Sequence, residues 1–472
     1  MDEKVRIKEL EIELGKLQRE FTRLGIPMLI SIDGLFGAGK GGVINKLGLV
    51  FDPRGVRLFS TLKENKEDKM YPFLYRFWKN IPSKGRIRIF ERSWNYALLK
   101  KIVNQKIDEI KKEEYLKEIN NFERTLTDSG VLLIKIFLNV SKEEQKSRVE
   151  KMMAGTNTRW DVVKSEKKEY KNYELYKTLI DDIINKTNNG KNLWKIVDSD
   201  NLDGCILEVL EYIKEKMEKK LKDKSIIKSG YKKYSGKDYI AESKINEELN
   251  EEIYNKKLKQ LQKELMELEY KIYKKRVPVI IAYEGSDAAG KGGNIRRVVE
   301  RLDPRGYEVV PIAAPNEEEK SYHYLWRFWR KIPKAGHLTI FDRTWYGRVL
   351  VERVEGFATE KQYKIAYNEI NEMEKVLTDY GAVVIKIWLQ IDKEEQLKRF
   401  EDRQNTPEKQ WKITDEDWRN REKWDKYQLA VNEMVEKTNT DFAKWKIINT
   451  NNKMTARIEA LKFIIDSIKK VL

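Results

Sequence analysis

The sequence predicts an α/β fold in which a parallel sheet has helices on both faces and a helical lid, and it predicts this fold twice in tandem. Three observations carry the prediction. Short apolar segments alternate with amphipathic helical patterns, a glycine-rich loop joins a strand to a helix, and a set of motifs recurs at one constant offset.

The composition is that of a soluble protein. At 472 residues the chain is long enough for about two to three domains. The one cysteine, Cys205, excludes an intrachain disulfide and suits a reducing cytoplasm. Residues 1–21 form a charged helical pattern rather than a signal peptide, and no apolar run approaches the ~18–20 residues of a membrane span. We therefore expect a cytoplasmic protein with no membrane partner.

The net charge of +17 requires an explanation. Nucleic acid is the commonest acidic partner, but the sequence contains no nucleic-acid recognition module, so we expect no nucleic acid. A long inorganic polyanion would use the same positive field. Lysine-rich helix faces that are simply solvated would give the same charge, and both explanations stay open from composition alone.

The repeat has an offset of 251 residues, which is the separation of Lys40 and Lys291. A constant register over so much chain means two copies of one domain. We place the first copy at 1–219, a basic linker at 220–244, and the second copy at 245–472, beginning with a helix up to residue 275. The repeated blocks are 52–55 with 303–306 (DPRG), 76–78 with 327–329 (RFW), 81–82 with 332–333 (IP), 90–94 with 341–345, 142–145 with 393–396 (KEEQ) and 194–196 with 445–447 (WKI).

Each copy alternates strands and helices. Near-continuous apolar strands separated by helices indicate a parallel sheet covered on both faces. Ligands of such sheets bind outside the carboxyl ends of the strands. In the second copy we expect strands at 279–283, 308–313, 338–341, 382–389 and 445–448, and a long helix at 360–377.

Gly285, Gly290 and Lys291 have the G-x-x-x-x-G-K spacing of a phosphate-binding loop. In such a loop the backbone N–H groups, the helix N-terminus and the lysine ammonium all face phosphate oxygens. A turn that only links strand to helix is the plainer alternative, but the strand, loop, lysine and helix together favour phosphate binding. Gly292 follows the lysine where a Mg²⁺-binding hydroxyl usually stands, so we expect Asp287 to supply a carboxylate instead.

Asp342 lies at the carboxyl end of the strand expected at 338–341. In P-loop proteins a carboxylate at this place holds Mg²⁺, although an aspartate at a strand end is often only a turn or cap residue. Asp287 and Asp342 would share the metal or accept a proton from an attacking phosphate. The only histidines, His323 and His337, form no cluster, so we expect neither a transition-metal site nor a nucleophilic triad.

Three arginines follow Asp342, namely Arg343, Arg348 and Arg353. Guanidinium groups stabilise the charge that spreads over phosphoryl oxygens during transfer. Arg348 and Glu352 are also spaced i,i+4 on an expected helix, so a surface salt bridge is the alternative.

A polar, aromatic segment at 407–427 follows Arg399 and Arg403, which are themselves i,i+4 on a helix. Over a phosphate site, such a helical hairpin would exclude water and supply arginines. Its tryptophans have a plainer role in packing the lid against the core. They are Trp411, Trp418 and Trp424.

The second copy resembles the polyphosphate kinase 2 family. The resemblance rests on GSDAAGKGG at 285–293, DPRG at 303–306, RFW at 327–329, FDRTWYGRVLVERVEGF at 341–357, EQLKRFEDR at 395–403 and the lid at 411–427. It implies a P-loop kinase-like fold that moves phosphate between inorganic polyphosphate and nucleotides with Mg²⁺. Two fused copies look like the polyphosphate:AMP phosphotransferase class of this family, which makes ADP from AMP.

The resemblance also implies residue roles. Catalytic roles fall to Asp287, Lys291, Asp342, Arg343, Arg348 and Arg353, with Mg²⁺ on Asp287 and Asp342. Phosphate or nucleotide binding falls to Gly285, Ala288, Gly290, Gly292, Gly293, Glu352, Arg399 and Arg403. Lys444 stands where the family usually has proline, a departure of little weight.

The first copy departs from the family at the residues that carry chemistry. We therefore expect it to be catalytically silent and either to support the second copy or to hold polyphosphate. At the offset of 251 the exchanges are Asp287 to Phe36, Asp342 to Glu91, Arg348 to Ala97, Glu352 to Lys101, Arg353 to Ile102 and Arg403 to Met152, while Lys40, Arg92 and Arg148 are kept.

The sequence thus predicts in-line transfer of a phosphoryl group from polyphosphate to AMP, without a covalent enzyme intermediate. No residue evidently recognises the base, so ADP stands as an alternative acceptor at this stage. An ATP-dependent nucleoside-monophosphate kinase would share the loop and lid, and a nucleic-acid-binding P-loop protein is the weakest alternative. Domains of this kind often assemble, so a homo-oligomer is a further expectation.

Overall fold

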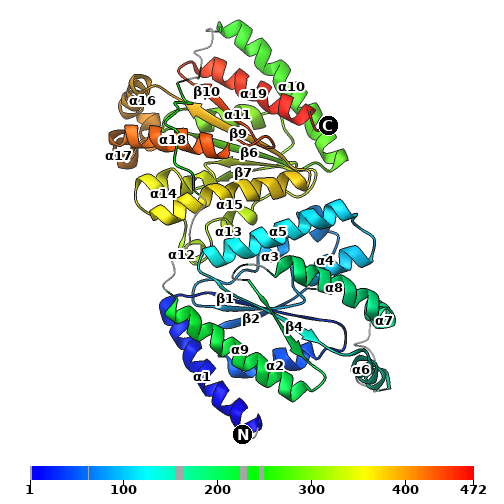
Figure 1. Cartoon of the computed structure of the whole chain (residues 1–472). Helices are drawn as coiled ribbons and strands as arrows, with labels where there is room; N and C mark the ends of the chain where they lie inside the picture. Colours follow the sequence, from blue (N-terminus) through cyan, green and yellow to red (C-terminus); the bar gives the residue numbers. More distant parts are fainter. Residues whose placement is uncertain are drawn as a thin grey trace. The chain divides into compact units, whose positions relative to one another are not determined.

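A computed structural model of the chain (Figure 1) describes residues 3–61, 63–154, 164–188, 190, 192–223, 231–241, 243 and 249–472. The chain forms two compact units. Unit 1 comprises Met1–Asn65, Phe73–Ile227 and Glu317–His323, and unit 2 comprises Lys66–Pro72, Lys228–Asn316 and Tyr324–Leu472. Each unit contains one five-stranded sheet whose paired strands are all parallel.

The sheet of unit 1 has the strand order β2-β3-β1-β4-β5. Helices α1, α2 and α9 cover one face, and α4, α5 and α8 cover the other (Figure 1). The strands are β1 (Met28–Gly34), β2 (Val56–Ser60), β3 (Ile87–Glu91), β4 (Leu132–Asn139) and β5 (Trp194–Asp198). The helices are α1 (Glu3–Leu24), α2 (Lys40–Val50), α3 (Tyr75–Trp78), α4 (Trp94–Val103), α5 (Glu109–Asp128), α6 (Lys142–Ala154), α7 (Lys164–Lys171), α8 (Tyr173–Thr187), α9 (Leu202–Lys222) and α12 (Glu317–Lys320).

The sheet of unit 2 has the equivalent order β10-β9-β6-β8-β7. Here α10, α11 and α19 lie on one face and α15 and α18 on the other (Figure 1). The strands are β6 (Val279–Gly285), β7 (Tyr307–Pro311), β8 (Leu338–Asp342), β9 (Val383–Gln390) and β10 (Trp445–Asn449). The helices are η1 (Asp68–Met70), α10 (Glu251–Lys275), α11 (Lys291–Val299), α13 (Trp326–Trp329), η3 (Trp345–Arg348), α14 (Val351–Val354), α15 (Glu360–Asp379), α16 (Lys393–Asn405), η4 (Pro407–Lys412), α17 (Asp415–Glu422), α18 (Trp424–Thr438) and α19 (Lys453–Lys469).

The predicted fold class is confirmed. All five strands expected in the second copy are present, and their ends move by only one or two residues. Every residue of β9 is buried, as are all residues of β6 except Gly285. Burial on both faces is what a sheet sandwiched between helices requires, and it explains the β-branched runs in these strands.

Local side-chain chemistry sets the helix ends. Helix α10 begins at Glu251 because the side-chain oxygen of Asn250 accepts a hydrogen bond from Ile253 N at 2.8 Å. The sequence predicted this helix from residue 245, but residues 245–248 lie outside the described residues. Helix α15 begins with a capping box between Thr359 and Gln362.

The expected linker at 220–244 is partly helical, because α9 continues to Lys222. Residues 224–230, 242 and 244 lie outside the described residues. Residues 231–241 and 243 belong to unit 2, where Tyr231 Oη donates to Glu433 and Ile240 N donates to Asn432 Oδ1 on α18. The limits of the two copies, at 219 and 245, stay predictions.

Two further expectations concern the whole chain. Among the helices that the structure describes, none has both the length and the apolar character needed to span a bilayer. Cys205 lies in the core of unit 1, where burial raises the pKa of its thiol to about 11. The thiol is therefore unreactive at neutral pH.

Candidate active site

The phosphate loop of unit 2 connects β6 to α11 and depends on glycine at both ends. A Cβ on Gly285, whose φ is 156°, would lie 2.6 Å from the carbonyl oxygen of Leu389 on β9. Gly290 caps α11 with a φ of 94°. Lys291 begins the helix, and its Nζ donates to Gly285 O at 2.6 Å, so the ammonium lies across the loop. The loop and the first turn of α11 also carry Ala288, Gly292 and Gly293.

Two non-glycine residues at the site have left-handed backbones. The φ angles are 61° at Ala288 and 65° at Arg343. Such conformations cost roughly 1–3 kcal/mol each and persist only where surrounding contacts fix them. Arg343 N donates to Tyr283 O at 3.0 Å, and Arg399 Nη1 donates to Ala288 O at 3.0 Å. The site therefore has backbone strain in both segments that approach the phosphate position.

A buried carboxylate joins these two segments. Glu284 is 5% exposed, and its Oε1 accepts hydrogen bonds from both the N–H and the hydroxyl of Thr344, each at 2.7 Å. Burial raises the pKa of Glu284, and the bonds from Thr344 oppose that rise. This clamp fixes the turn after β8, so that Asp342 and Arg343 lie beside the loop.

The two predicted carboxylates and Arg343 form one electrostatic group with Lys291. Asp287 Oδ1 lies 3.3 Å from Arg343 Nη2, and Asp287 Oδ2 accepts from Asn420 Nδ2 at 2.8 Å. Burial lowers the pKa of Lys291, whereas Asp287 and Asp342 both act to raise it. Burial lowers the pKa of Arg343, but the carboxylates of Asp287, Glu284, Glu416 and Asp342 outweigh burial and raise it. The structure thus brings together four of the residues expected to be catalytic.

The carboxylate pair fits a magnesium–phosphate complex. Mg²⁺ is usually bound by one or two carboxylates and completes its shell with water and substrate phosphates. Asp287 and Asp342 would supply that number of protein ligands. Within the described part of the chain, no group of three or more histidine, cysteine, aspartate or glutamate side chains could form a closed metal cage. The donor set is therefore suited to a metal that arrives with phosphate.

The outer arginines are each paired with a carboxylate. Arg348 Nη1 lies 2.7 Å from Glu352 Oε2, which is the i,i+4 salt bridge considered from the sequence. Arg353 Nη1 lies 2.8 Å from Glu433 Oε2 and donates to Tyr367 Oη at 2.9 Å. The expected continuous helix is wrong at this point, because η3 ends at Arg348 and α14 begins three residues later, at Val351.

The lid-side arginines bind backbone carbonyls. Arg399 is 5% exposed, and its guanidinium donates to Ala288 O and to Thr450 O. Arg148 makes the equivalent bonds in unit 1, to Gly37 O and Ser199 O. The shared role of these two arginines is to hold a loop in place, and direct phosphate binding by Arg399 stays a prediction.

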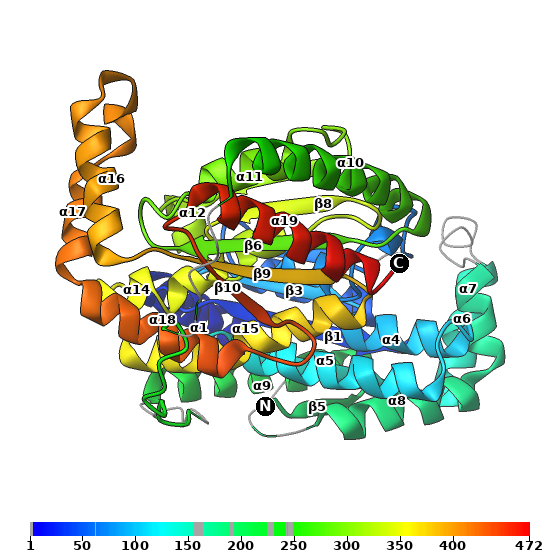
Figure 2. The same cartoon turned by 90° about the horizontal axis from the view of Figure 1, so that it is seen from above.

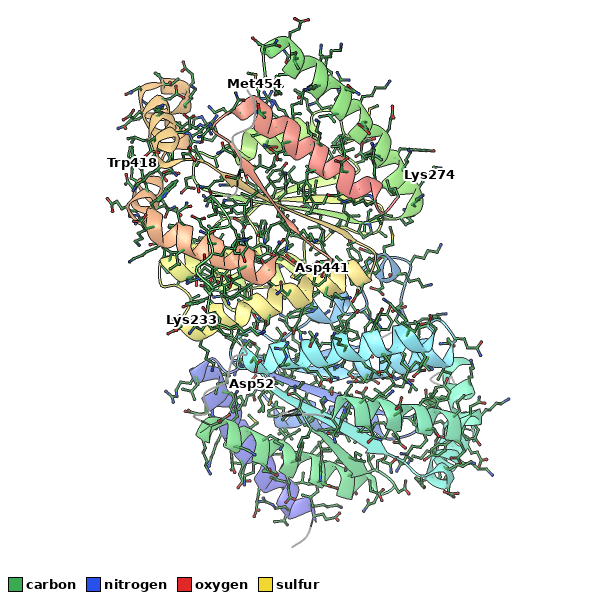
Figure 3. All side chains as sticks on the ribbon, turned by 45° about the horizontal axis from the view of Figure 1, so that its top comes forward. Asp52, Lys233, Lys274, Trp418, Asp441 and Met454 are labelled. Atoms are coloured by element: carbon green, nitrogen blue, oxygen red, sulfur yellow. The ribbon has the colours of Figure 1, made fainter. Side chains whose placement is uncertain are left out.

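The lid consists of α16, η4 and α17, which extend away from the sheet of unit 2 (Figure 2). Arg403 Nη1 donates to Lys412 O at 3.1 Å and so joins α16 to η4. Trp418, labelled in Figure 3, packs its ring 5.1 Å from that of Phe400. Trp424 packs against the core of unit 2. The packing role expected for Trp411 is wrong, because this side chain is 77% exposed.

Sequence reasoning missed several residues at the site. Gln396 Nε2 donates to Asp287 O at 3.0 Å, and the repeated KEEQ motif was the available signal, since Gln145 bonds Phe36 O in unit 1. Glu284 could have been found from the acidic residue at the same position of the first copy, Asp33. Asp33 likewise accepts hydrogen bonds from the residue after the turn, Ser93. No pattern in the sequence pointed to Asn420 or Glu433.

Comparisons with known proteins agree with this geometry. A model of the family described as Polyphosphate kinase 2 (PPK2) matches residues 1–225 and again 248–471. A polyphosphate:AMP phosphotransferase from Pseudomonas aeruginosa is 37% identical over 98% of this chain and 95% of its own length. An ADP-polyphosphate phosphotransferase from Rhizobium meliloti is 40% identical but covers 46% of this chain and 76% of its own length. The crystal structure of a polyphosphate kinase 2 from Pseudomonas aeruginosa superimposes with a TM-score of 0.88 and 36% identity, covering 99% of this chain and 96% of that one.

Proposed function

Because this chain belongs to the polyphosphate kinase 2 family, we propose that it transfers the terminal phosphoryl group of inorganic polyphosphate to AMP and so forms ADP. The observation that carries this proposal is the near-full-length similarity, over both copies, to a relative named for AMP. The relative named for ADP matches about half of the chain, which supports AMP as the acceptor.

The residues of unit 2 account for the reaction as follows. Loop N–H groups and Lys291 bind the terminal phosphates of the donor. An oxygen of the AMP α-phosphate attacks the terminal phosphorus as the bridging P–O bond breaks, so the shortened polyphosphate leaves with the electron pair of that bond. Arg343, Arg348 and Arg353 neutralise the charge that spreads over the transferring group, a contribution worth up to ~10³–10⁵ in rate.

Asp287 and Asp342 would hold Mg²⁺, which when bound neutralises phosphate oxygens and aligns donor with acceptor. The lid contributes by excluding water from the reacting phosphate. Besides Arg399 and Gln396 on α16, its contacts with the loop include Asn420 on α17, whose amide donates to Asp287 Oδ2. A lid held at this carboxylate favours transfer to AMP over hydrolysis.

The first copy takes no part in turnover. Its loop has Phe36 in place of Asp287, and its β3 turn is followed by Ala97 and Ile102 in place of two arginines. We further propose a cytoplasmic location, an assembly of identical chains, and no nucleic-acid partner. The buried thiol of Cys205 supports the reducing compartment, and a polyanionic donor supplies the partner that the net charge of +17 calls for.

The deciding experiment follows nucleotide formation by the purified chain with Mg²⁺ and AMP, offered either polyphosphate or ATP. ADP formed from polyphosphate establishes donor and acceptor together. ADP formed only from ATP would make the protein a nucleoside-monophosphate kinase and overturn the proposal. ATP formed from ADP and polyphosphate, with no reaction of AMP, would move it to the ADP class.

A further inference from the structure

The phosphate loop of the first copy is in contact with a buried carboxylate from its own chain. Glu169 on α7 is fully buried. Its Oε1 accepts a hydrogen bond from Phe36 N at 2.5 Å, and its Oε2 accepts from Tyr96 Oη at 2.6 Å. Lys100 Nζ lies 3.6 Å from the same Oε2. Burial and the carboxylate raise the pKa of Tyr96, which therefore remains a hydrogen-bond donor.

The group that Glu169 binds belongs to the anion-binding surface of the loop. Phe36 is the third residue of the G-x-x-x-x-G-K segment, and the backbone N–H groups of such loops receive phosphate oxygens. Lys40 keeps the position of its counterpart, because its Nζ donates to Gly34 O at 2.7 Å. Backbone and lysine thus keep the arrangement of the active copy, and an internal oxygen anion lies on the loop.

The equivalent contact in unit 2 has the opposite distribution of charge. At the offset of 251, Glu169 corresponds to Asn420 and Phe36 to Asp287. In unit 2 the loop supplies the carboxylate and the lid supplies an amide donor, 2.8 Å apart. In unit 1 the equivalent lid segment, α7, supplies the carboxylate and the loop supplies a backbone donor. The carboxylate of this contact therefore lies on the loop in unit 2 and on α7 in unit 1.

Apolar packing reinforces this contact. The Phe36 side chain is 7% exposed and forms a cluster with Val149, and Met152 and Tyr170 pack against the pair. The positions that correspond to the four are Asp287, Phe400, Arg403 and Arg421. Three charged groups are thus replaced by apolar or aromatic ones, and the resulting small hydrophobic core holds α6 and α7 of the first copy against its loop.

We infer that Glu169 is a built-in anionic ligand of the first phosphate loop, where its carboxylate occupies the place of a phosphate oxygen. The first copy is thereby a latent site for inorganic phosphoanions, closed by its own lid. This inference rests on the proposed function only in assigning turnover to the second copy. It excludes polyphosphate binding at the first loop of the wild-type chain.

Hydrogen–deuterium exchange of the full-length chain with tripolyphosphate as probe tests the inference, because the two loops fall in different peptides. In the wild type, tripolyphosphate should slow exchange in peptides spanning 285–291 and leave those spanning 34–40 unchanged. In Glu169→Gln, exchange at 34–40 should rise without the probe and fall about tenfold with it, as charge-assisted hydrogen bonds to the probe replace those to Glu169. Glu174→Gln, an exposed neutralisation on α8, is the matched control and should behave as the wild type.

Three results would overturn the inference. They are slowing at 34–40 by tripolyphosphate in the wild type, no slowing there in Glu169→Gln, and equal slowing in Glu174→Gln. If Glu169→Gln unfolds unit 1, Tyr96→Phe removes one donor without changing charge and should give a smaller response of the same sign. ADP formation in the same samples should stay within about twofold of wild type. If Glu169→Gln loses ADP formation while exchange at 34–40 changes as expected, the result would instead contradict the assignment of turnover to the second copy.

Discussion

Arg353 and Glu433 form an ion pair in which the carboxylate is almost completely buried. Arg353 Nη1 lies 2.8 Å from Glu433 Oε2, and Glu433 is 2% exposed. Tyr231 Oη donates to the other carboxylate oxygen at 2.5 Å. At the offset of 251 the pair is replaced by Ile102 and Asp182, so it is specific to the copy that we assign to catalysis.

Glu433 should therefore act as a positioning residue for Arg353. Glu433→Gln removes the charge that orients the guanidinium, and we expect kcat to fall roughly 10–100-fold while KM for polyphosphate changes little. Asp182→Asn in the first copy is the matched control and should leave both constants unchanged. Glu433→Asp should recover part of kcat, and an unchanged kcat in Glu433→Gln would contradict the role.

The two loop lysines provide a direct test of which copy is active. Lys291→Ala should abolish ADP formation, because it removes the point charge that binds the donor phosphates. Lys40→Ala is the same change on the equivalent loop and should leave turnover intact. Both variants are assayed with AMP and polyphosphate after circular dichroism has shown that they fold. The reverse pattern would place catalysis in the first copy.

The contact of Asn420 with Asp287 predicts a change in what the enzyme makes. Asn420→Ala leaves the Asp287 carboxylate in place but removes the hydrogen bond from α17 to it. We expect ADP formation to fall about tenfold and the ratio of free phosphate to ADP to rise, as water reaches the donor. Parallel assays of phosphate and ADP give the ratio. A fall in ADP with a constant ratio would mean that the lid does not exclude water.

Burial of Lys291 predicts an alkaline limit on substrate binding. Burial lowers the pKa of this ammonium, and Asp287 only partly offsets the effect. As pH rises through the lowered pKa, the positive charge of Lys291 is lost. The KM for polyphosphate should therefore begin to increase at a pH below ~10.4, the pKa of an ordinary lysine. Lys291→Arg keeps its charge throughout this range, and its KM should stay constant with pH. Parallel curves for the two proteins would exclude Lys291 as the titrating group.

Each unit also contains a lysine–glutamate pair with almost no solvent exposure. Lys386 lies 2.9 Å from Glu374 in unit 2, and Lys135 lies 2.6 Å from Glu123 in unit 1. Removing one partner of such a pair typically costs about 3–5 kcal/mol, because the other charge stays buried. Lys386→Met and Lys135→Met should each lower the free energy of unfolding by about this amount, measured by denaturant titration. The double variant Lys386→Met/Glu374→Leu should recover most of the lost free energy of unfolding. A further decrease as large as that of the single variant would contradict the explanation.

The strands and the loop could be predicted because their signals are local. The apolar runs predicted the strands of the sheet, and the G-x-x-x-x-G-K spacing predicted that Lys291 and Asp287 belong to one phosphate loop. The break between Arg348 and Val351 was missed because the i,i+4 spacing of charges fits a helix that the backbone does not form. Glu433 and Asn420 were missed for another reason. Each reaches its partner through tertiary packing, from 80 and 133 residues away in the chain, and no local pattern records such a contact.

The matching backbone of the two turns has a consequence for engineering. Arg92 in the first copy has a φ of 62°, and Arg343 in the second has a φ of 65°, so the strained turn is retained where several side chains expected to be catalytic are replaced. The first copy therefore keeps part of the backbone that a second active site would need. The substitutions that would rebuild it are Phe36→Asp, Glu91→Asp, Ala97→Arg, Ile102→Arg, Met152→Arg and Glu169→Asn. A chain with two working sites would also need a change of backbone, because α4 is one continuous helix from Trp94 to Val103 where unit 2 has η3 and α14 separated by Val349 and Leu350.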